Sequence, residues 1–253
     1  MCLTSFALAE DFKVGMECDY APYNWMQSEP NEFTVPISGG GYADGYDVQV
    51  ARIIAEKLGR ELVIVKTEWD GLPMGVMSGK TDAIIAGMSP TAERKLTIDF
   101  TDLYWNSDLV VVVRKDGPYA NATKLSDLSG AKITGQLNTF HYSVIDQIPG
   151  VKKMTAMDTF AAMITALGAK AIDGYISERP GALSAQISNP DLTFVTFAQG
   201  EGFETNVEDT GVAVGLKMGS DLRDPINAIL AEITYEERQQ LMDDALARQP
   251  LNN

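Results

Sequence analysis

Short apolar runs alternate along this chain with segments in which apolar residues recur every three or four positions. Runs with the length and character of buried strands lie at 12–16, 62–65, 83–86 and 109–113. Residues 48–58 have the helical spacing, and Gly59 follows as a helix stop. Residues 71–78 predict a second helix, which ends at Gly79. Strands that alternate with helices in this way predict the α/β class with a largely parallel sheet.

The same alternation begins again after the polar segment 114–118. Further strands are expected at 132–134, 171–176 and 212–216, and further helices from about Thr139, after Asp158 or Thr159, from Pro180, and over 225–247. A segment rich in glycine and acidic residues, 201–210, precedes the last strand. We therefore predict two lobes, one formed by 10–113 with 211–253 and the other by 114–210. Two crossings would join them, with a cleft between the lobes where ligands tend to bind.

Two segments lie outside this alternation. Residues 28–44 include three successive glycines and predict a surface loop. Residues 1–9 end in Ala-Leu-Ala and resemble the tail of a secretion signal, although an ordinary N-terminal strand is the alternative. A signal would place the mature protein in the periplasm or elsewhere outside the cytoplasm. The Ala-Leu-Ala sequence favours a free form over a lipid-anchored one.

Charge and composition narrow the possible partners. The chain has 20 basic and 35 acidic residues, a net charge of −15, which repels phosphate backbones and anionic lipids. We therefore expect no nucleic-acid or membrane-surface partner. Its two cysteines and its single histidine form no metal motif, so neither a metal nor a cofactor is expected. The histidine, His141, is expected on an exposed helix face, with a place near the cleft, after a loop of the second lobe, as the alternative.

Several short motifs occur in a fixed order along the chain. They are VGMECDYAPY at 14–23, GYDV at 45–48, WDGL at 69–72, DAIIAGMSPTAER at 82–94, IDFT at 98–101 and DGYISE at 173–178. With this order and spacing the chain resembles the polar amino-acid solute-binding proteins, the receptor components of ABC importers. The resemblance extends from residue 12 to about 247. It implies a two-lobed periplasmic-binding-protein fold of type II that closes by hinge motion, with no catalytic residues.

The resemblance also implies how an amino-acid headgroup is held. Arg94 would grip the ligand's carboxylate, because a planar guanidinium can bind two oxygens at once. Its helpers would be Ala86, Gly87, Met88 and Ser89. Glu178 would receive the α-ammonium group. The alternatives are a surface arginine in the charged cluster 93–95 and a helix N-terminal acid ahead of Pro180.

The remaining candidates would contact the ligand's side chain or its carboxylate from the second lobe. Tyr20 and Trp69 match two aromatic positions that sandwich the side chain, with core packing as the alternative. Glu17 would meet the distal end of the ligand, unless it is a strand-end residue in solvent. Thr139 and Gln136 would contribute from the second lobe. Their segment reads QLNT where the family usually has a Ser-Gly-Thr type loop.

These assignments predict a receptor that binds a basic amino acid, arginine first and then lysine, ornithine or histidine. Glutamine or another polar amino acid is the alternative, because a carboxylate also accepts hydrogen bonds from an amide. A dehydratase with the same fold and a sensor module are less favoured, since no nucleophile–base pair or attached signalling segment is evident. The expected partners are the free amino acid and the membrane permease of an importer, and the receptor is expected to be a monomer.

Overall fold

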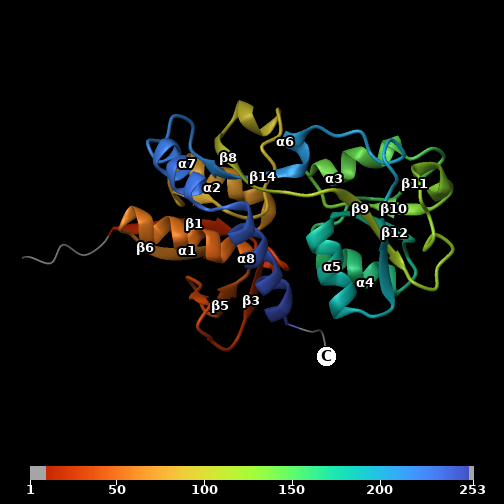
Figure 1. Cartoon of the computed structure of the whole chain (residues 1–253), viewed down its shortest axis with the longest axis horizontal. Helices are drawn as coiled ribbons and strands as arrows, with labels where there is room; N and C mark the ends of the chain where they lie inside the picture. The colour runs from red at the N-terminus through yellow and green to blue at the C-terminus, as the bar shows by residue number, and fades with distance from the viewer. Residues whose placement is uncertain (1–9, 251–253) are drawn as a thin grey trace, which may run out of the picture.

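The computed structural model describes residues 10–250 and shows two lobes, each built around a five-stranded sheet (Figure 1). The first sheet has the order β6-β1-β7-β14-β8. Its strands are β1 (Asp11–Met16), β6 (Glu61–Lys66), β7 (Ala83–Ile84), β8 (Asp99–Asn106) and β14 (Gly211–Leu216). β1 pairs in parallel with β6 and β7, whereas β14 is antiparallel to β7 and β8. The two-lobed α/β fold is therefore confirmed, and the first sheet is mixed.

The second sheet has the order β11-β10-β12-β9-β13. Its strands are β9 (Leu109–Arg114), β10 (Lys132–Thr134), β11 (Lys152–Lys153), β12 (Gly174–Glu178) and β13 (Leu192–Val195). β9 pairs with both β12 and β13, so it belongs to the second lobe. The sequence-based boundary after Val113 is therefore too late, and the first crossing lies at 107–108. An apolar run shows that a strand is buried but does not show which sheet it joins.

Helices and short turns cover the faces of both sheets. The first lobe contains α1 (Tyr46–Leu58), η1 (Trp69–Gly71), α2 (Leu72–Ser78), η2 (Arg94–Leu96), α7 (Arg223–Glu232) and α8 (Tyr235–Arg248). The second contains η3 (Leu125–Leu128), α3 (Phe140–Ser143), η4 (Val144–Gln147), α4 (Phe160–Gly168) and α5 (Arg179–Ser188), and α6 (Val207–Thr210) lies in the second crossing. Gly59 and Gly79 end their helices with φ of 66° and 75°, and the Thr159 hydroxyl caps α4. These helix boundaries agree with the sequence analysis.

The segment 28–44 is only partly a surface loop. It contributes β4 (Val35–Pro36) and β5 (Tyr42–Asp44) to a small sheet of order β2-β3-β5-β4, together with β2 (Asp19–Tyr20) and β3 (Asn24–Gln27). Val35 and Ile37 are buried, and Ile37 bridges to Ile64 of β6. The expectation of a simple loop was wrong, because it gave weight to the three glycines and overlooked the alternation of Phe33, Val35 and Ile37, which has the period of a strand.

The C-terminal end of α8 is held by both lobes. Arg248 pairs with the buried carboxylate of Asp44 in the first lobe, at 3.2 Å between Nη2 and Oδ1. The next residue, Gln249, accepts a hydrogen bond from the hydroxyl of Ser184 on α5 in the second lobe. Its amide nitrogen donates to the Ser184 carbonyl at 3.4 Å. This pair of contacts, which we call the C-terminal tie, adds a non-covalent link to the two crossings.

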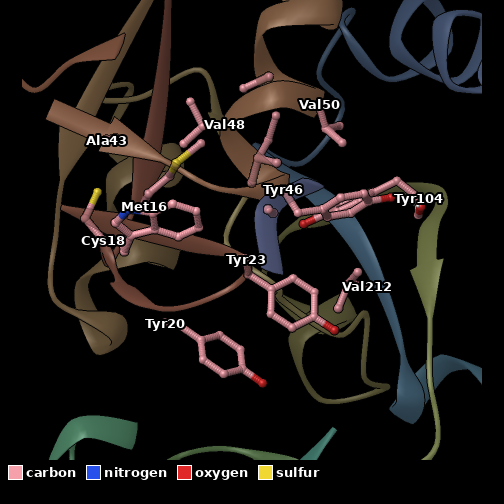
Figure 2. Close-up of a cluster of buried hydrophobic side chains, with 14 of the residues drawn as sticks. Met16, Cys18, Tyr20, Tyr23, Ala43, Tyr46, Val48, Val50, Tyr104 and Val212 are labelled. Atoms are coloured by element: carbon pink, nitrogen blue, oxygen red, sulfur yellow. Dashed lines mark hydrogen bonds between the residues drawn. The ribbon is translucent and has the colours of Figure 1, made fainter. Parts of the chain in front are cut away.

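An aromatic cluster fills the first lobe beneath the cleft (Figure 2). Tyr23, Tyr46 and Tyr104 are each at most 1% exposed, and Trp25 is buried beside them. The proposed secretion signal at 1–9 lies outside the described residues. Within residues 10–250, no helix is both long and apolar enough to cross a membrane.

Candidate functional site

Side chains from both lobes meet around one small cavity between the sheets. The first lobe contributes Tyr20, Trp69, Gly87, Ser89 and Arg94, and the second contributes Gln136, Thr139, Phe140 and His141. The cavity has a volume of about 10 Å³, which is about the space that one water needs. The lobes are thus closed on each other, and a molecule as large as an amino acid can enter only if they move apart.

Arg94 begins the short turn η2 at the first-lobe side of this cavity. Its guanidinium donates to the Ser89 carbonyl at 2.9 Å and, across the cleft, to the Asn138 carbonyl at 3.1 Å. It also lies 5.1 Å from the centre of the Trp69 ring. Among residues 10–250, no carboxylate comes within ion-pair distance of it. Burial lowers the pKa of Arg94 to about 10, as expected for a cation that lacks an anionic partner.

Glu178 ends β12 on the opposite side of the cleft and is 3% exposed. One carboxylate oxygen lies 2.8 Å from Nε2 of His141, and the other accepts a hydrogen bond from the Tyr20 hydroxyl of the first lobe. Burial alone would raise the pKa of Glu178, but the histidine and the hydroxyl outweigh it and lower that pKa. Glu178 is therefore held as an anion in a site that excludes water.

The two predicted sandwich residues both line the cavity, but their rings have protein partners. Tyr20 stacks on Phe160 with the ring centres 4.1 Å apart, and on Tyr23 at 4.9 Å. Its hydroxyl is therefore the part that reaches Glu178. The ring of Trp69 is covered by Arg94 instead of by Tyr20.

Glu17 lies at the end of β1 and is 6% exposed, so it is not a strand-end residue in solvent. Its two oxygens accept weak hydrogen bonds, each 3.4 Å long, from the amide of Gln136 across the cleft. Burial raises the pKa of Glu17 to about 7, and the nearby acids Asp19, Glu68 and Asp70 add to the shift. No basic side chain among the described residues pairs with it.

Glu17 also lines a recess that adjoins the cavity at Trp69. The recess has a volume of about 280 Å³, and its lining is rich in acids: Glu17, Glu68, Asp70 and Asp158, with Trp69 and Leu137. The cleft thus holds an uncompensated cation, Arg94, on one side of Trp69's ring and a group of carboxylates in the recess that Trp69 also lines. We call this second feature the acidic recess.

The other predicted residues take different positions. Thr139 lines the cavity, but its hydroxyl donates to the Gln136 carbonyl at 2.7 Å. Ala86 and Met88 pack into the apolar core of the first lobe, so only Gly87 and Ser89 of the segment 86–89 reach the cavity.

A buried polar network fixes the floor of the cleft beneath Gly87. The backbone N–H of Gly87 donates to the Tyr104 hydroxyl at 3.2 Å, and that hydroxyl donates to Asp47 at 2.8 Å. Asn24 donates to the second oxygen of Asp47, also at 2.8 Å. Burial raises the pKa of Asp47 to about 7, although these hydrogen bonds oppose the shift. The motif GYDV thus supports the binding segment from below.

Sequence reasoning missed three residues of the site. His141 was expected on an exposed helix face, yet it is 8% exposed and pairs with Glu178. Asn138 donates to Asp70 across the cleft at 3.0 Å, and Phe160 covers Tyr20. The departure of the QLNT segment from the family pattern was the one signal that pointed to this loop. Within residues 10–250, no cluster of three or more His, Cys, Asp or Glu side chains is arranged to hold a metal ion.

A family model named bacterial extracellular solute-binding proteins, family 3, matches residues 12–245, nearly the whole described chain. The chain belongs to this family. Membership assigns it to the binding proteins of transport systems rather than to the enzymes.

Two curated relatives of this family 3 protein are named after amino acids. A probable histidine-binding protein from Campylobacter jejuni is 33% identical over 195 residues, which cover 76% of this chain and 70% of the relative. An arginine-binding extracellular protein from Bacillus subtilis is 25% identical over 225 residues, covering 87% and 79%.

Solved structures agree with the fold of this family 3 protein. An amino acid ABC transporter substrate-binding protein from Streptococcus pneumoniae, bound to L-arginine, is similar with a TM-score of 0.80 and 26% identity. The match covers 94% of each chain. The two-lobed arrangement and the interlobe cleft are therefore those of substrate-binding proteins.

Proposed function

We propose that this protein is the extracytoplasmic receptor of an amino-acid ABC importer and binds a basic amino acid, arginine first, between its lobes. The observation that carries the proposal is that one cleft contains two unpaired charges of opposite sign. The cleft contains a guanidinium without an anionic partner, Arg94, and a buried carboxylate without a cationic partner, Glu17. A zwitterion with a cationic side chain supplies both missing charges.

The headgroup would be held by charges that are already fixed in place. In this proposal Arg94 leaves the Ser89 and Asn138 carbonyls and binds the ligand's carboxylate with its planar fork. Glu178 receives the α-ammonium in exchange for one of its present partners. Burying both groups of the zwitterion is favourable only because each meets an opposite charge.

The side chain would run along Trp69 into the acidic recess. When the Arg94 side chain moves to the ligand's carboxylate, it uncovers a face of Trp69 that suits an aliphatic stem or a guanidinium. Glu17 then accepts hydrogen bonds from the charged tip, and the neighbouring acids favour a cation over a neutral amide. The names of the histidine- and arginine-binding relatives support the same class of ligand.

Glutamine is the second candidate, because one feature of the site favours an amide. The oxygens of Glu17 already accept from the amide of Gln136, so a ligand amide would fit the same acceptors. Lysine, ornithine and histidine rank behind arginine, since they lack its planar array of five N–H donors.

The family is extracellular by description, and we infer delivery of the ligand to a membrane permease as the next step. A receptor of this kind works as a monomer that docks with its lobes closed. The net charge of −15 also favours the protein's remaining separate from copies of itself.

A thermal-shift screen tests the proposal directly. The purified protein is heated with each of the twenty amino acids, ornithine and citrulline, because a ligand that binds only the folded form raises its stability. We expect the largest increase with arginine and little with citrulline, its neutral isostere. If no amino acid raises the melting temperature, the receptor proposal is wrong. If citrulline or glutamine equals arginine, the receptor stands but Glu17 does not select for charge.

A further inference from the structure

The two oxygens of Glu178 have different partners, and only one of these partners can carry a positive charge. Tyr20 donates to one oxygen from the first lobe, whereas His141 Nε2 lies 2.8 Å from the other. The side chains of His141 and Glu178 are 10% and 4% exposed, so water screens this pair little. His141 is the single histidine of the chain.

We propose that ligand binding expels a proton from His141, so that the affinity of this receptor for its amino acid depends on pH. The inference rests on the proposed function, in which Glu178 receives the α-ammonium of the ligand. An imidazolium and an ammonium on the same carboxylate repel each other, and burial strengthens that repulsion. The ligand therefore binds best to the form in which His141 is neutral.

The closed arrangement of the lobes also favours a neutral ring, because of the second ring nitrogen of His141. Nδ1 is buried and has no hydrogen-bond partner among the described residues. In a neutral ring that donates from Nε2 to Glu178, Nδ1 carries a lone pair and no proton. In an imidazolium, Nδ1 would carry a buried N–H without an acceptor, which is the more costly state. The ring packs against Phe160 in a T-shaped arrangement, with the ring centres 5.8 Å apart. A ligand that closes the lobes therefore favours the neutral ring.

Among residues 10–250, Glu178 is the one carboxylate that pairs with His141. The titratable and charged groups on the elements packed around it are Glu178 and Tyr175 of β12, Tyr20 of β2, Tyr23, Arg94 of η2, and Asp146 and Lys153 by η4. Asp146 is 2.8 Å from Lys153 and so has its own cation. Arg94 is a cation on the same cavity and disfavours a charged His141.

The proton balance follows from these contacts. The protein with imidazolium at position 141 binds the zwitterion, the Nδ1–H proton goes to the buffer, and the complex holds a neutral ring. Affinity should fall by up to about tenfold for each pH unit below the range in which the free protein's histidine is neutral.

Calorimetry at pH 6 in two buffers with different heats of ionisation counts the released protons. Arginine and glutamine are each titrated into the wild type, His141→Gln and Glu17→Gln. Glu17 can also release a proton, but only to a cationic side chain, whereas the ammonium near His141 is common to both ligands. We expect release with both ligands in the wild type and in Glu17→Gln. With His141→Gln we expect none for glutamine.

Nuclear magnetic resonance keeps the test decisive if His141→Gln folds poorly. Protein without a histidine tag has one imidazole, so one set of ring signals reports on it in the wild type. We expect ligand to shift this ring towards its neutral form at pH 6. A ring whose charge is unaffected by ligand between pH 5 and 8 would overturn the inference. Absence of binding by every amino acid would instead overturn the proposed function.

Discussion

The charged side chains of the cleft differ in how far the protein itself neutralises them. Glu178 has a histidine and a hydroxyl as partners, and Asp47 has two hydrogen-bond donors. Among residues 10–250, Arg94 has two carbonyl groups and the Trp69 ring as partners but no anion, and Glu17 has one distant amide. The residues with incomplete partners gain most from a ligand. Substitutions there should therefore weaken ligand binding without destabilising the ligand-free protein.

Replacing Arg94 by alanine should weaken binding of the best ligand by about 2–5 kcal/mol, since the ligand's carboxylate would be buried without its cation. Titration calorimetry measures this loss. Arg223→Ala is the control, because Arg223 is exposed, pairs only with Asp224 and lies outside the cavity. An affinity for Arg94→Ala within threefold of the wild type would show that the carboxylate binds elsewhere.

Glu17→Gln should stabilise the ligand-free protein at pH 8 and leave its stability unchanged at pH 4. The folded-state pKa of Glu17 is about 7, above its ordinary value of 4.5, so the folded state favours the protonated acid. That contribution is fully present below pH 4.5 and is lost as the pH rises through 7. The difference at pH 8 is at most about 3 kcal/mol.

Urea unfolding at both pH values checks this expectation. Glu29→Gln is the control, because Glu29 is exposed. At each pH this variant should have the same free energy of unfolding as the wild type. Equal stability of Glu17→Gln and wild type at pH 8 would mean that the buried carboxylate has a cation after all. Binding of arginine should weaken in the same variant, because selectivity and stability depend on the same charge.

At the scale of elements, one turn positions both the small sheet and α1. Gly45 precedes α1 with φ of 131°, and a Cβ atom there would lie 2.3 Å from the Tyr23 carbonyl oxygen. This close approach lets β3 and the start of α1 pack together, which places Asp47 beneath Gly87. The motif GYDV therefore depends on glycine for backbone geometry.

Gly45→Ala should cost at least about 2 kcal/mol of folding free energy, from the unfavourable φ and the clash with backbone. Gly59→Ala is the matched control. Gly59 also has a positive φ, 66°, but a Cβ atom there would meet nothing within 4 Å. Its cost should be about 1 kcal/mol, from backbone conformation alone. Denaturant unfolding compares the two, and equal losses would show that the contact with Tyr23 is unimportant.

The sequence predicted helices and strands better than it predicted which elements pack against one another. Local periodicity and glycine stops correctly gave α1 and α2, and the ordered motifs brought Arg94 and Glu178 to one cleft. β9 was placed in the wrong lobe, because strand pairing joins residues far apart in the chain. The burial of His141 was missed for the same reason, since its partners come from β12 and from the stacked ring of Phe160.

At the scale of the whole molecule, the lobes contact each other directly across the cleft. Glu17 with Gln136, Asp70 with Asn138, and Tyr20 with Glu178 join opposite sides. These contacts and the cavity of about 10 Å³ describe a closed arrangement that has to open for loading. A ligand that touches both lobes then favours closure through its contacts with each side.

Small-angle scattering should show the particle contract when saturating arginine is added. The expected radius of gyration of the complex is close to that of the closed arrangement, in which the cavity between the lobes measures about 10 Å³. Glycine, which has the same headgroup but no side chain, provides the comparison ligand and should give less contraction at equal concentration. An unchanged radius with arginine would count against hinge closure as the response to the ligand.

The C-terminal tie has a consequence for the path of that opening. Consecutive residues, Arg248 and Gln249, are held by Asp44 of one lobe and Ser184 of the other. A single peptide unit has little length to give, so the edge of the molecule near the end of α8 acts as a pivot while it stays bonded. We expect the lobes to rotate about that edge as a hinge. Gln249→Ala would remove the bond to the second lobe, so the lobes should open to a wider range of angles and about a less fixed axis.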